Sequence, residues 1–215
     1  MKGDIVIVEE HHRSAARTIV DRLESDIRAA SRPYTITVAG ESGSGKSETG
    51  KAIADECESR GLGAYVFQQD DYFRLPPKSN DRKRREDISW VGIGEVRLDL
   101  LDEHLAAARD RSSEVAKPLV DYDSDSIGEE TVDLSGIDVA IAEGTYTTLL
   151  HHADCRVFIA RTRIDTLQSR RKRGREPIEP FLERVLEIEH RIIAPHREKA
   201  DVIISADYEV SFVDR

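Results

Sequence analysis

The sequence of 215 residues has little cysteine, few aromatic side chains and no long apolar run. Cysteine occurs only at Cys57 and Cys155, which is too little for a disulfide framework, so we expect a reducing compartment such as the cytoplasm. No stretch approaches the roughly 20 apolar residues that a membrane-spanning helix requires. The apolar run at residues 5–8 is also too short for a signal peptide. The sequence therefore predicts a cytoplasmic protein without a membrane partner.

The sequence also lacks an excess of positively charged residues. Lysine and arginine total 32 against 42 aspartates and glutamates, which gives a formal net charge of −10. Because nucleic-acid polymers are met by basic surfaces, this balance argues against such a polymer as the main partner. The length suits one α/β domain with a substantial core.

Short apolar runs alternate with amphipathic helical patterns along the chain. We expect strands at 4–8, 34–39, 64–68, 139–142, 156–160 and 201–205, and helices at 14–30, 46–60, 98–108, 163–173 and 179–193. The segment 75–87 contains Pro76-Pro77 and mixed charges, so it is predicted to be an exposed loop. Alternating strands and helices imply right-handed crossovers and a mostly parallel, doubly wound sheet flanked by helices, which is an α/β fold.

Residues 40–47 match the phosphate-binding pattern G-x-x-x-x-G-K-[ST] at every fixed position. Glycines let backbone N–H groups point at phosphate oxygens, and the start of the following helix adds a positive dipole end. We expect Lys46 to reach the β- and γ-phosphates of ATP and the Ser47 hydroxyl to ligate Mg²⁺. The predicted ATP-binding residues are Gly40, Glu41, Ser42, Gly43, Ser44, Gly45, Lys46 and Ser47.

Acidic residues follow two of the expected strands, at the edge where doubly wound sheets bind ligands. Asp70 and Asp71 follow the strand at 64–68, where a carboxylate either accepts the proton of an attacking hydroxyl or merely caps a turn. Glu143 follows the strand at 139–142 and matches the position at which P-loop proteins hold Mg²⁺ or its water shell. Beside a phosphate-binding loop, this pattern favours phosphoryl transfer.

The basic residues are concentrated at 170–175, where five cations occur in six positions. A solvated helix face or a nucleic-acid patch would explain such a run. Gly174 and Pro177 suggest a hinged end, so we favour a mobile lid whose arginines, Arg173 and Arg175, neutralise charge on the transferring phosphoryl group.

In their order and spacing, these segments resemble the uridine kinase and phosphoribulokinase family over about residues 34–205. The matching motifs are Gln69-Asp70-Asp71-Tyr72-Phe73, Pro118 with Tyr122-Asp123, Glu143-Gly144, Arg173-Gly174-Arg175, and Pro195 with Ala200-Asp201-Val202-Ile203. The resemblance implies a P-loop kinase with an arginine lid that uses ATP and Mg²⁺ to phosphorylate a hydroxyl of a small molecule. It also implies that Asp70, rather than Asp71, is the catalytic base. We accordingly divide the chain into a strand–helix extension at 1–33 and a kinase domain at 34–215.

The uracil-handling part of the family pattern is missing here, because Ser124-Asp125-Ser126 stands where the family has an aromatic residue and a His-Thr-Arg-like triplet. Our candidates for the acceptor pocket are Tyr72, Trp90, Tyr122 and Asp123. Core packing explains Trp90 equally well, and a turn explains Tyr122 and Asp123 equally well.

The sequence leaves three functions open. They are a kinase of a sugar, vitamin precursor or hydroxy acid, a nucleoside kinase proper, and a nucleotide-dependent switch without an acceptor. The helix at 14–30 is expected either to pack on the sheet or to mediate self-association, so a homo-oligomer also stays open. The histidine pairs at 11–12 and 151–152 have no partners at metal-ligand spacing in the sequence.

Overall fold

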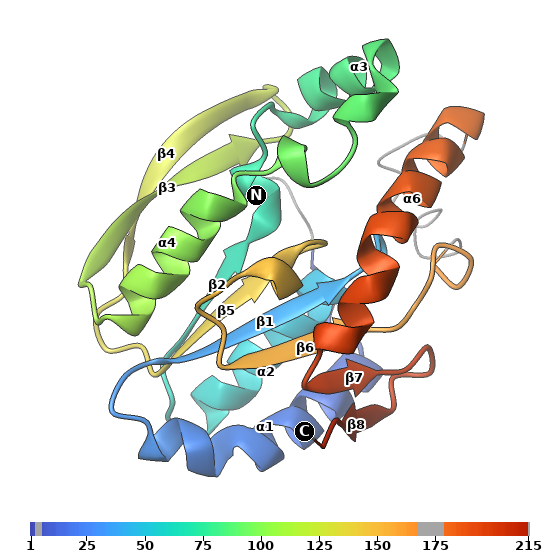
Figure 1. Cartoon of the computed structure of the whole chain (residues 1–215). Helices are drawn as coiled ribbons and strands as arrows, with labels where there is room; N and C mark the ends of the chain where they lie inside the picture. The colour runs from blue at the N-terminus through green and yellow to red at the C-terminus, as the bar shows by residue number, and fades with distance from the viewer. Residues whose placement is uncertain (3–5, 167–178, 215) are drawn as a thin grey trace.

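A computed structural model describes residues 1–2, 6–166 and 179–214. Its centre is a six-stranded sheet in the order β2-β5-β1-β6-β7-β8 (Figure 1). The first five strands in this order are parallel, and β8 is antiparallel to β7. The prediction of a mostly parallel α/β sheet is confirmed. The strands are β1 (Tyr34–Gly40), β2 (Ala64–Gln68), β5 (Val139–Glu143), β6 (Cys155–Ile159), β7 (Val202–Ile204) and β8 (Val210–Phe212).

Helices cover both faces of this sheet (Figure 1). Helices α1 (Glu10–Ala29) and α2 (Lys46–Ser59) lie on one face, and α4 (Leu98–Arg109) with the last turn of α6 (Pro180–Ile193) lies on the other. Because successive strand residues point to opposite faces, Val38 packs beneath α1 and α2 while Ala39 packs on the side of α4. Within the described residues, no helix combines the length and apolar content needed to cross a bilayer.

The N-terminal extension is part of this core. The apolar stripe of α1 is buried against α2 and the sheet, so the structure decides for packing on the sheet. The strand expected at 4–8 does not form at residues 6–8, and residues 3–5 lie outside the described part. Val8 packs on the core, while Ile7 is 65% exposed.

Two further elements differ from the expectation. The segment predicted as a loop contains α3 (Pro77–Glu86), which starts with proline in its first turn and buries only Asn80. Since α3 has no apolar stripe, periodicity could not reveal it. An antiparallel hairpin of β3 (Glu114–Asp121) and β4 (Ser126–Asp133) was also not expected. Of the helix predicted at 163–173, residues 163–166 form a turn, and the rest lies outside the described residues.

Short 3₁₀ helices connect these elements. They are η1 (Gln69–Tyr72), η2 (Ile88–Trp90), η3 (Ile93–Glu95), η4 (Thr147–Leu149) and η5 (Ala194–Lys199). The first of them, η1, directly follows β2 and carries the Gln-Asp-Asp segment to the carboxyl-terminal edge of the sheet.

Candidate active site

The loop between β1 and α2 has the backbone geometry of a phosphate cradle. Gly43 (φ 76°) and Gly45 (φ 98°) adopt left-handed conformations that favour glycine. The Lys46 ammonium lies over the loop and donates to the carbonyl oxygen of Glu41 at 3.1 Å. The loop therefore leads into the N-terminus of the 14-residue helix α2, where backbone N–H groups and the helix dipole favour an anion.

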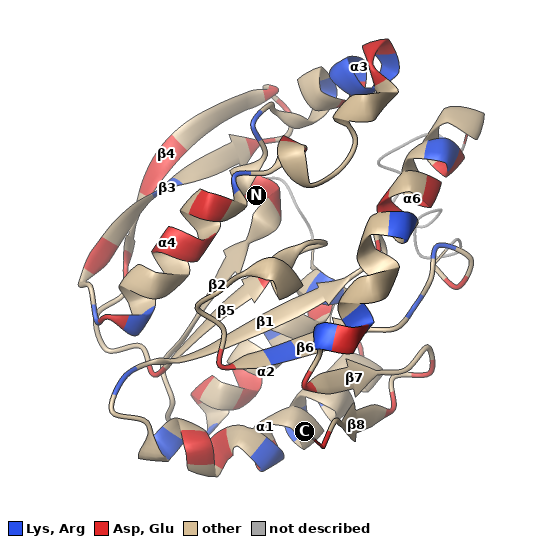
Figure 2. Ribbon diagram, in the orientation of Figure 1, with Lys and Arg blue, Asp and Glu red and all other residues tan. Residues whose placement is uncertain are grey.

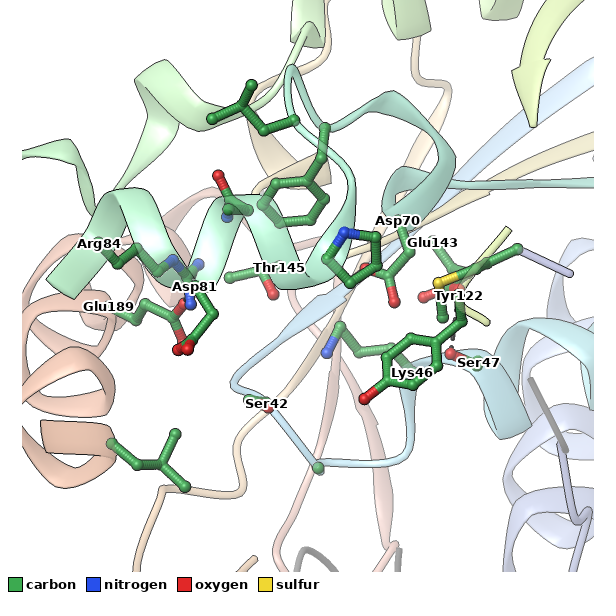
Figure 3. A pocket seen from close by; sticks show the side chains of 17 residues that line it. Ser42, Lys46, Ser47, Asp70, Asp81, Arg84, Tyr122, Glu143, Thr145 and Glu189 are labelled. Carbon is green, nitrogen blue, oxygen red and sulfur yellow. Dashed lines mark hydrogen bonds and ion pairs between the residues drawn. The ribbon is translucent and has the colours of Figure 1, made fainter. Parts of the chain in front are cut away.

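Strand order brings the two predicted carboxylates to this loop. Strand β5 lies between β1 and β2, with Glu143 in register with Val38 and Gln68. The Ser47 hydroxyl donates to Glu143 Oε1 at 3.0 Å, and both side chains line a cavity of about 210 Å³ together with Asp70 and Lys46 (Figure 3). The structure thus brings together residues that are almost 100 positions apart in the sequence.

A close approach between Gln69 and Gly144 fixes the relative position of these carboxylates. The buried Gln69 Oε1 accepts a hydrogen bond from the Tyr146 N–H at 2.8 Å. A Cβ atom on Gly144 would come within 2.2 Å of the Gln69 Cβ, so no larger residue fits without displacement of this backbone. The residues next to Asp70 and Glu143 therefore lock the ends of β2 and β5 together.

The charges around the cavity suit a divalent cation bound with a polyphosphate. Burial raises the pKa of Glu143, and the neighbouring Asp70 carboxylate raises that pKa further. Two carboxylates close together in a buried site favour a compensating cation. The oxygen-only donors Ser47 and Glu143 match the preference of Mg²⁺. The residues present therefore fit Mg²⁺ as well as a nucleoside triphosphate.

Neighbouring aspartates have different surroundings. Asp71 is 1% exposed, accepts from Lys117 Nζ at 2.8 Å and from the Val120 N–H at 3.0 Å, and so ties η1 to strand β3. Asp70 is half-buried and lines the cavity. Of the two aspartates, only Asp70 lines the cavity.

Three of the four predicted acceptor residues lie outside the cavity. Tyr72 is fully buried in the core, where its hydroxyl is 2.9 Å from His104 Nδ1. Trp90 Nε1 donates to Asn80 Oδ1 at 2.8 Å, so this hydrogen bond ties the indole ring to α3. Asp123 is exposed in the β3–β4 turn, with its carbonyl oxygen 2.9 Å from Lys78 Nζ.

Tyr122 is the one acceptor candidate that lines the cavity (Figure 3). Tyr72, Trp90 and Asp123 do not line this cavity, because the sequence pattern gave each residue's place in the chain but not the direction of its side chain.

The opposite wall of the cavity was not predicted. Arg84 on α3 lies between Glu95 (2.5 and 3.0 Å) and Glu189 on α6 (3.2 Å). Basic residues cluster on α3 beside the mixed charges of α6 (Figure 2). A run of charges in the sequence is typical of a solvated segment, so no local signal distinguished Arg84. The other lining residues from these and adjacent segments are Phe73, Leu75, Pro77, Asn80, Asp81, Thr145 and Leu182.

Glu41 differs from the other predicted ATP-binding residues, because its side chain is bound to residues outside the loop. The carboxylate accepts from the Arg163 N–H at 2.5 Å and lies 2.6 Å from His190 Nδ1 on α6. Only the backbone of Glu41 therefore remains available to the loop. The predicted lid residues Arg173 and Arg175 lie outside the described residues.

A second cavity, of about 460 Å³, lies beside the same loop. Gly43 borders both cavities, and Gly45 borders the second one. Its other walls include His11 from the extension, Arg161 after β6, and Tyr208 before β8. None of these residues was predicted to belong to a site.

The parallel sheet, the phosphate cradle and the carboxylates at its edge define a P-loop kinase architecture. A solved structure titled a possible uridine kinase from Bacillus stearothermophilus superposes with a TM-score of 0.64 at 19% identity, covering 87% of this chain and 97% of that one. The Zeta toxin family model matches residues 18–109.

Curated relatives agree with this class. The chain is 29% identical over 195 residues to the bifunctional alpha-galactosidase/sucrose kinase AgaSK of Mediterraneibacter gnavus, covering 84% of this chain but only about a fifth (21%) of that protein. It is also 29% identical over 189 residues to the uridine kinase of Bacillus pumilus, covering 81% of this chain and 87% of that protein. The resemblance to the uridine kinase and phosphoribulokinase family is confirmed.

Proposed function

We propose that this protein is an ATP-dependent kinase that transfers the γ-phosphoryl group of ATP to a hydroxyl of a small, polar metabolite. One observation carries the proposal. The half-buried Asp70 carboxylate lines the same cavity as Lys46 and as the hydrogen-bonded pair Ser47–Glu143. A base, a phosphate-binding ammonium and a cation site together are what phosphoryl transfer requires.

The chemistry follows from this arrangement. The triphosphate lies along the backbone amides of residues 42–47, and the Lys46 ammonium contacts its terminal phosphates. When bound at Ser47 and Glu143, Mg²⁺ would neutralise charge on the phosphate oxygens. The acceptor oxygen forms a bond to the γ-phosphorus while the bond to the β,γ-bridging oxygen breaks, and that oxygen leaves with the electron pair on ADP. The hydroxyl proton passes to Asp70.

The acceptor side of the cavity favours a polyhydroxylated molecule. Asn80, Asp81, Arg84 and Glu189 offer amide, carboxylate and guanidinium groups, which together donate and accept hydrogen bonds to hydroxyls. The match to a relative whose name includes sucrose kinase points in the same direction.

A nucleoside is the second candidate acceptor. The name of the Bacillus pumilus relative supports it. Within the described residues, the aromatic side chains that line this cavity are Phe73 and Tyr122, either of which can stack on a base.

An acceptor screen tests the proposal. Initial rates of ADP release are measured with ATP, Mg²⁺ and a panel of sugars, polyols, hydroxy acids and nucleosides. We expect at least one sugar or polyol to raise ADP release well above ATP hydrolysis alone, and the product to carry a new phosphate ester by mass spectrometry. A nucleoside product would select the second candidate. ATP binding without stimulation by any panel member would contradict the kinase and favour a nucleotide-dependent switch.

A further inference from the structure

The first turn of α1 packs against the back of the phosphate-binding loop through Tyr208. The Tyr208 hydroxyl donates to the Ser44 carbonyl oxygen at 2.9 Å and accepts from Arg161 Nη1 at 3.0 Å. It lies 3.1 Å from His12 Nε2. A Cβ on Gly45 would come within 2.2 Å of this hydroxyl and 3.0 Å of the same imidazole nitrogen. The extension and the loop are therefore fitted to each other.

The hydrogen bonds of His12 fix its role in this contact. The Glu9 N–H donates to His12 Nδ1 at 3.1 Å, so the neutral ring carries its proton on Nε2 and donates it to Tyr208. Burial lowers the pKa of His12 to about 4, which keeps the ring neutral near pH 7. Tyr208 itself adopts φ 65°, an uncommon conformation for a non-glycine residue that persists only where surrounding contacts hold it.

His11 has a different position, because its ring forms part of the wall of the second cavity. Its centroid lies 4.1 Å from that of Tyr208, and the guanidinium carbon of Arg161 lies 5.1 Å from the same phenol ring. An imidazole, a phenol and a guanidinium together offer stacking and cation–π contacts, which suit a flat aromatic ligand.

A metal ion is a weaker interpretation of this cluster. Donor atoms of Glu9, His11 and His12 lie within 4.8 Å of one another, a proximity that the sequence did not show. A metal-bound imidazole usually donates its second N–H to an acceptor. Here the second nitrogen of His12 instead accepts from a backbone N–H, and Nε2 is already bonded to Tyr208. Both ring nitrogens are committed without a metal.

The second cavity is adjacent to the proposed triphosphate site, because Gly43 lines both cavities. A nucleotide whose γ-phosphate faces Asp70 extends its sugar and base away from that carboxylate, past the loop. We propose that the purine base occupies this second cavity and stacks on His11, so that the extension before β1 completes the nucleotide site. This inference rests on the proposed function. It assigns base contact to a segment that lies outside the family motifs.

The test measures separately how much the base and the phosphates contribute to binding. Dissociation constants of Mg·ADP and of inorganic tripolyphosphate are measured by calorimetry for the wild type, His11→Ala and His11→Phe. Arg17→Ala is the matched control, because Arg17 is an exposed residue of the same helix. Thermal unfolding of each variant shows that it is folded.

Loss of one stacking contact should weaken Mg·ADP binding at least about fivefold in His11→Ala. Tripolyphosphate binding should stay within about twofold, since the loop amides remain in place. His11→Phe keeps an aromatic face and should bind Mg·ADP within about threefold of the wild type. Arg17→Ala should change neither constant.

Three results would overturn the inference. They are unchanged Mg·ADP affinity in His11→Ala, an equal loss for tripolyphosphate, and a His11→Phe variant as weak as His11→Ala. If the wild type binds tripolyphosphate and Mg·ADP while His11→Ala behaves identically, only the role of His11 fails. If the wild type binds neither ligand, the proposed kinase function fails together with the inference.

Discussion

Replacing the adjacent aspartates one at a time separates catalysis from stability. Asp70→Asn keeps the shape of the side chain but removes the proton acceptor, so kcat should fall by about 10²–10⁴. The Kd for Mg·ATP should change little, because the loop amides and Lys46 remain. The free energy of unfolding should be unchanged or rise by up to about 1 kcal/mol, since the substitution removes the repulsion that raises the pKa of Glu143.

Asp71→Asn should behave in the opposite way. It removes the charge opposite the buried Lys117 ammonium, at 2.8 Å, and replaces one of the two acceptor oxygens with an NH2 donor. Breaking a buried pair costs about 3–5 kcal/mol. Lys117 also lies 2.7 Å from Glu130, so we expect a smaller loss of about 2–4 kcal/mol in the free energy of unfolding. Once corrected for the folded fraction, kcat should stay within about threefold of the wild type.

Urea unfolding gives the two stabilities, and ADP release with the acceptor found in the screen gives kcat. A folded Asp70→Asn variant with wild-type turnover would remove this residue from the mechanism. A stable Asp71→Asn variant that is as inactive as Asp70→Asn would refute the assignment of separate roles.

Three further changes test other parts of the structure. Gly144→Ala should lower the free energy of unfolding, measured by urea titration, by about 2–3 kcal/mol, because its Cβ would overlap Gln69. The control Gly94→Ala has open space around its Cβ and should change the free energy of unfolding by less than about 0.5 kcal/mol. Ser47→Ala should raise the Mg²⁺ concentration for half-maximal activity about tenfold in a magnesium titration of the rate. The affinity for ADP without Mg²⁺ should stay within about threefold of the wild type in a binding titration. The folded chain takes up a proton at His12 only near pH 4, but the unfolded chain does so near 6.5, so stability is lost as the pH falls through this window. His12→Gln should therefore lose less stability between pH 7 and pH 5 than the wild type, and equal losses in the two proteins would contradict the burial of a neutral imidazole.

The elements that the sequence predicted well are those in which neighbouring residues carry the whole signal. The phosphate-binding loop, α2, β2 and β5 are contiguous segments with an apolar period or a glycine pattern, and the structure has each of them within a residue or two of the expected bounds. Glu143 and Ser47 were assigned to one cation site from their positions alone, and their side chains are hydrogen-bonded.

The missed elements are held by polar contacts between distant segments. Helix α3 is held partly by Arg84, which reaches Glu95 and Glu189, so its residues look like an exposed charge run in the sequence. In the hairpin, the core-facing Lys117 is buried opposite Asp71, which breaks the apolar alternation that would indicate a strand. The second cavity could not be foreseen, because His11 and Tyr208 lie at opposite ends of the chain.

The sequence by itself determined the parallel α/β class, the phosphate-binding loop and the presence of carboxylates at the strand ends, because each depends on residues adjacent along the chain. Only the tertiary structure decided which aspartate of the neighbouring pair faces the cavity, which aromatic rings line it, and what the N-terminal helix contacts. Asp70 and Asp71 are neighbours in η1, yet the Asp70 side chain lines the cavity whereas the Asp71 carboxylate pairs with the Lys117 ammonium. The direction in which each side chain points is set by packing between segments, which no local sequence pattern encodes.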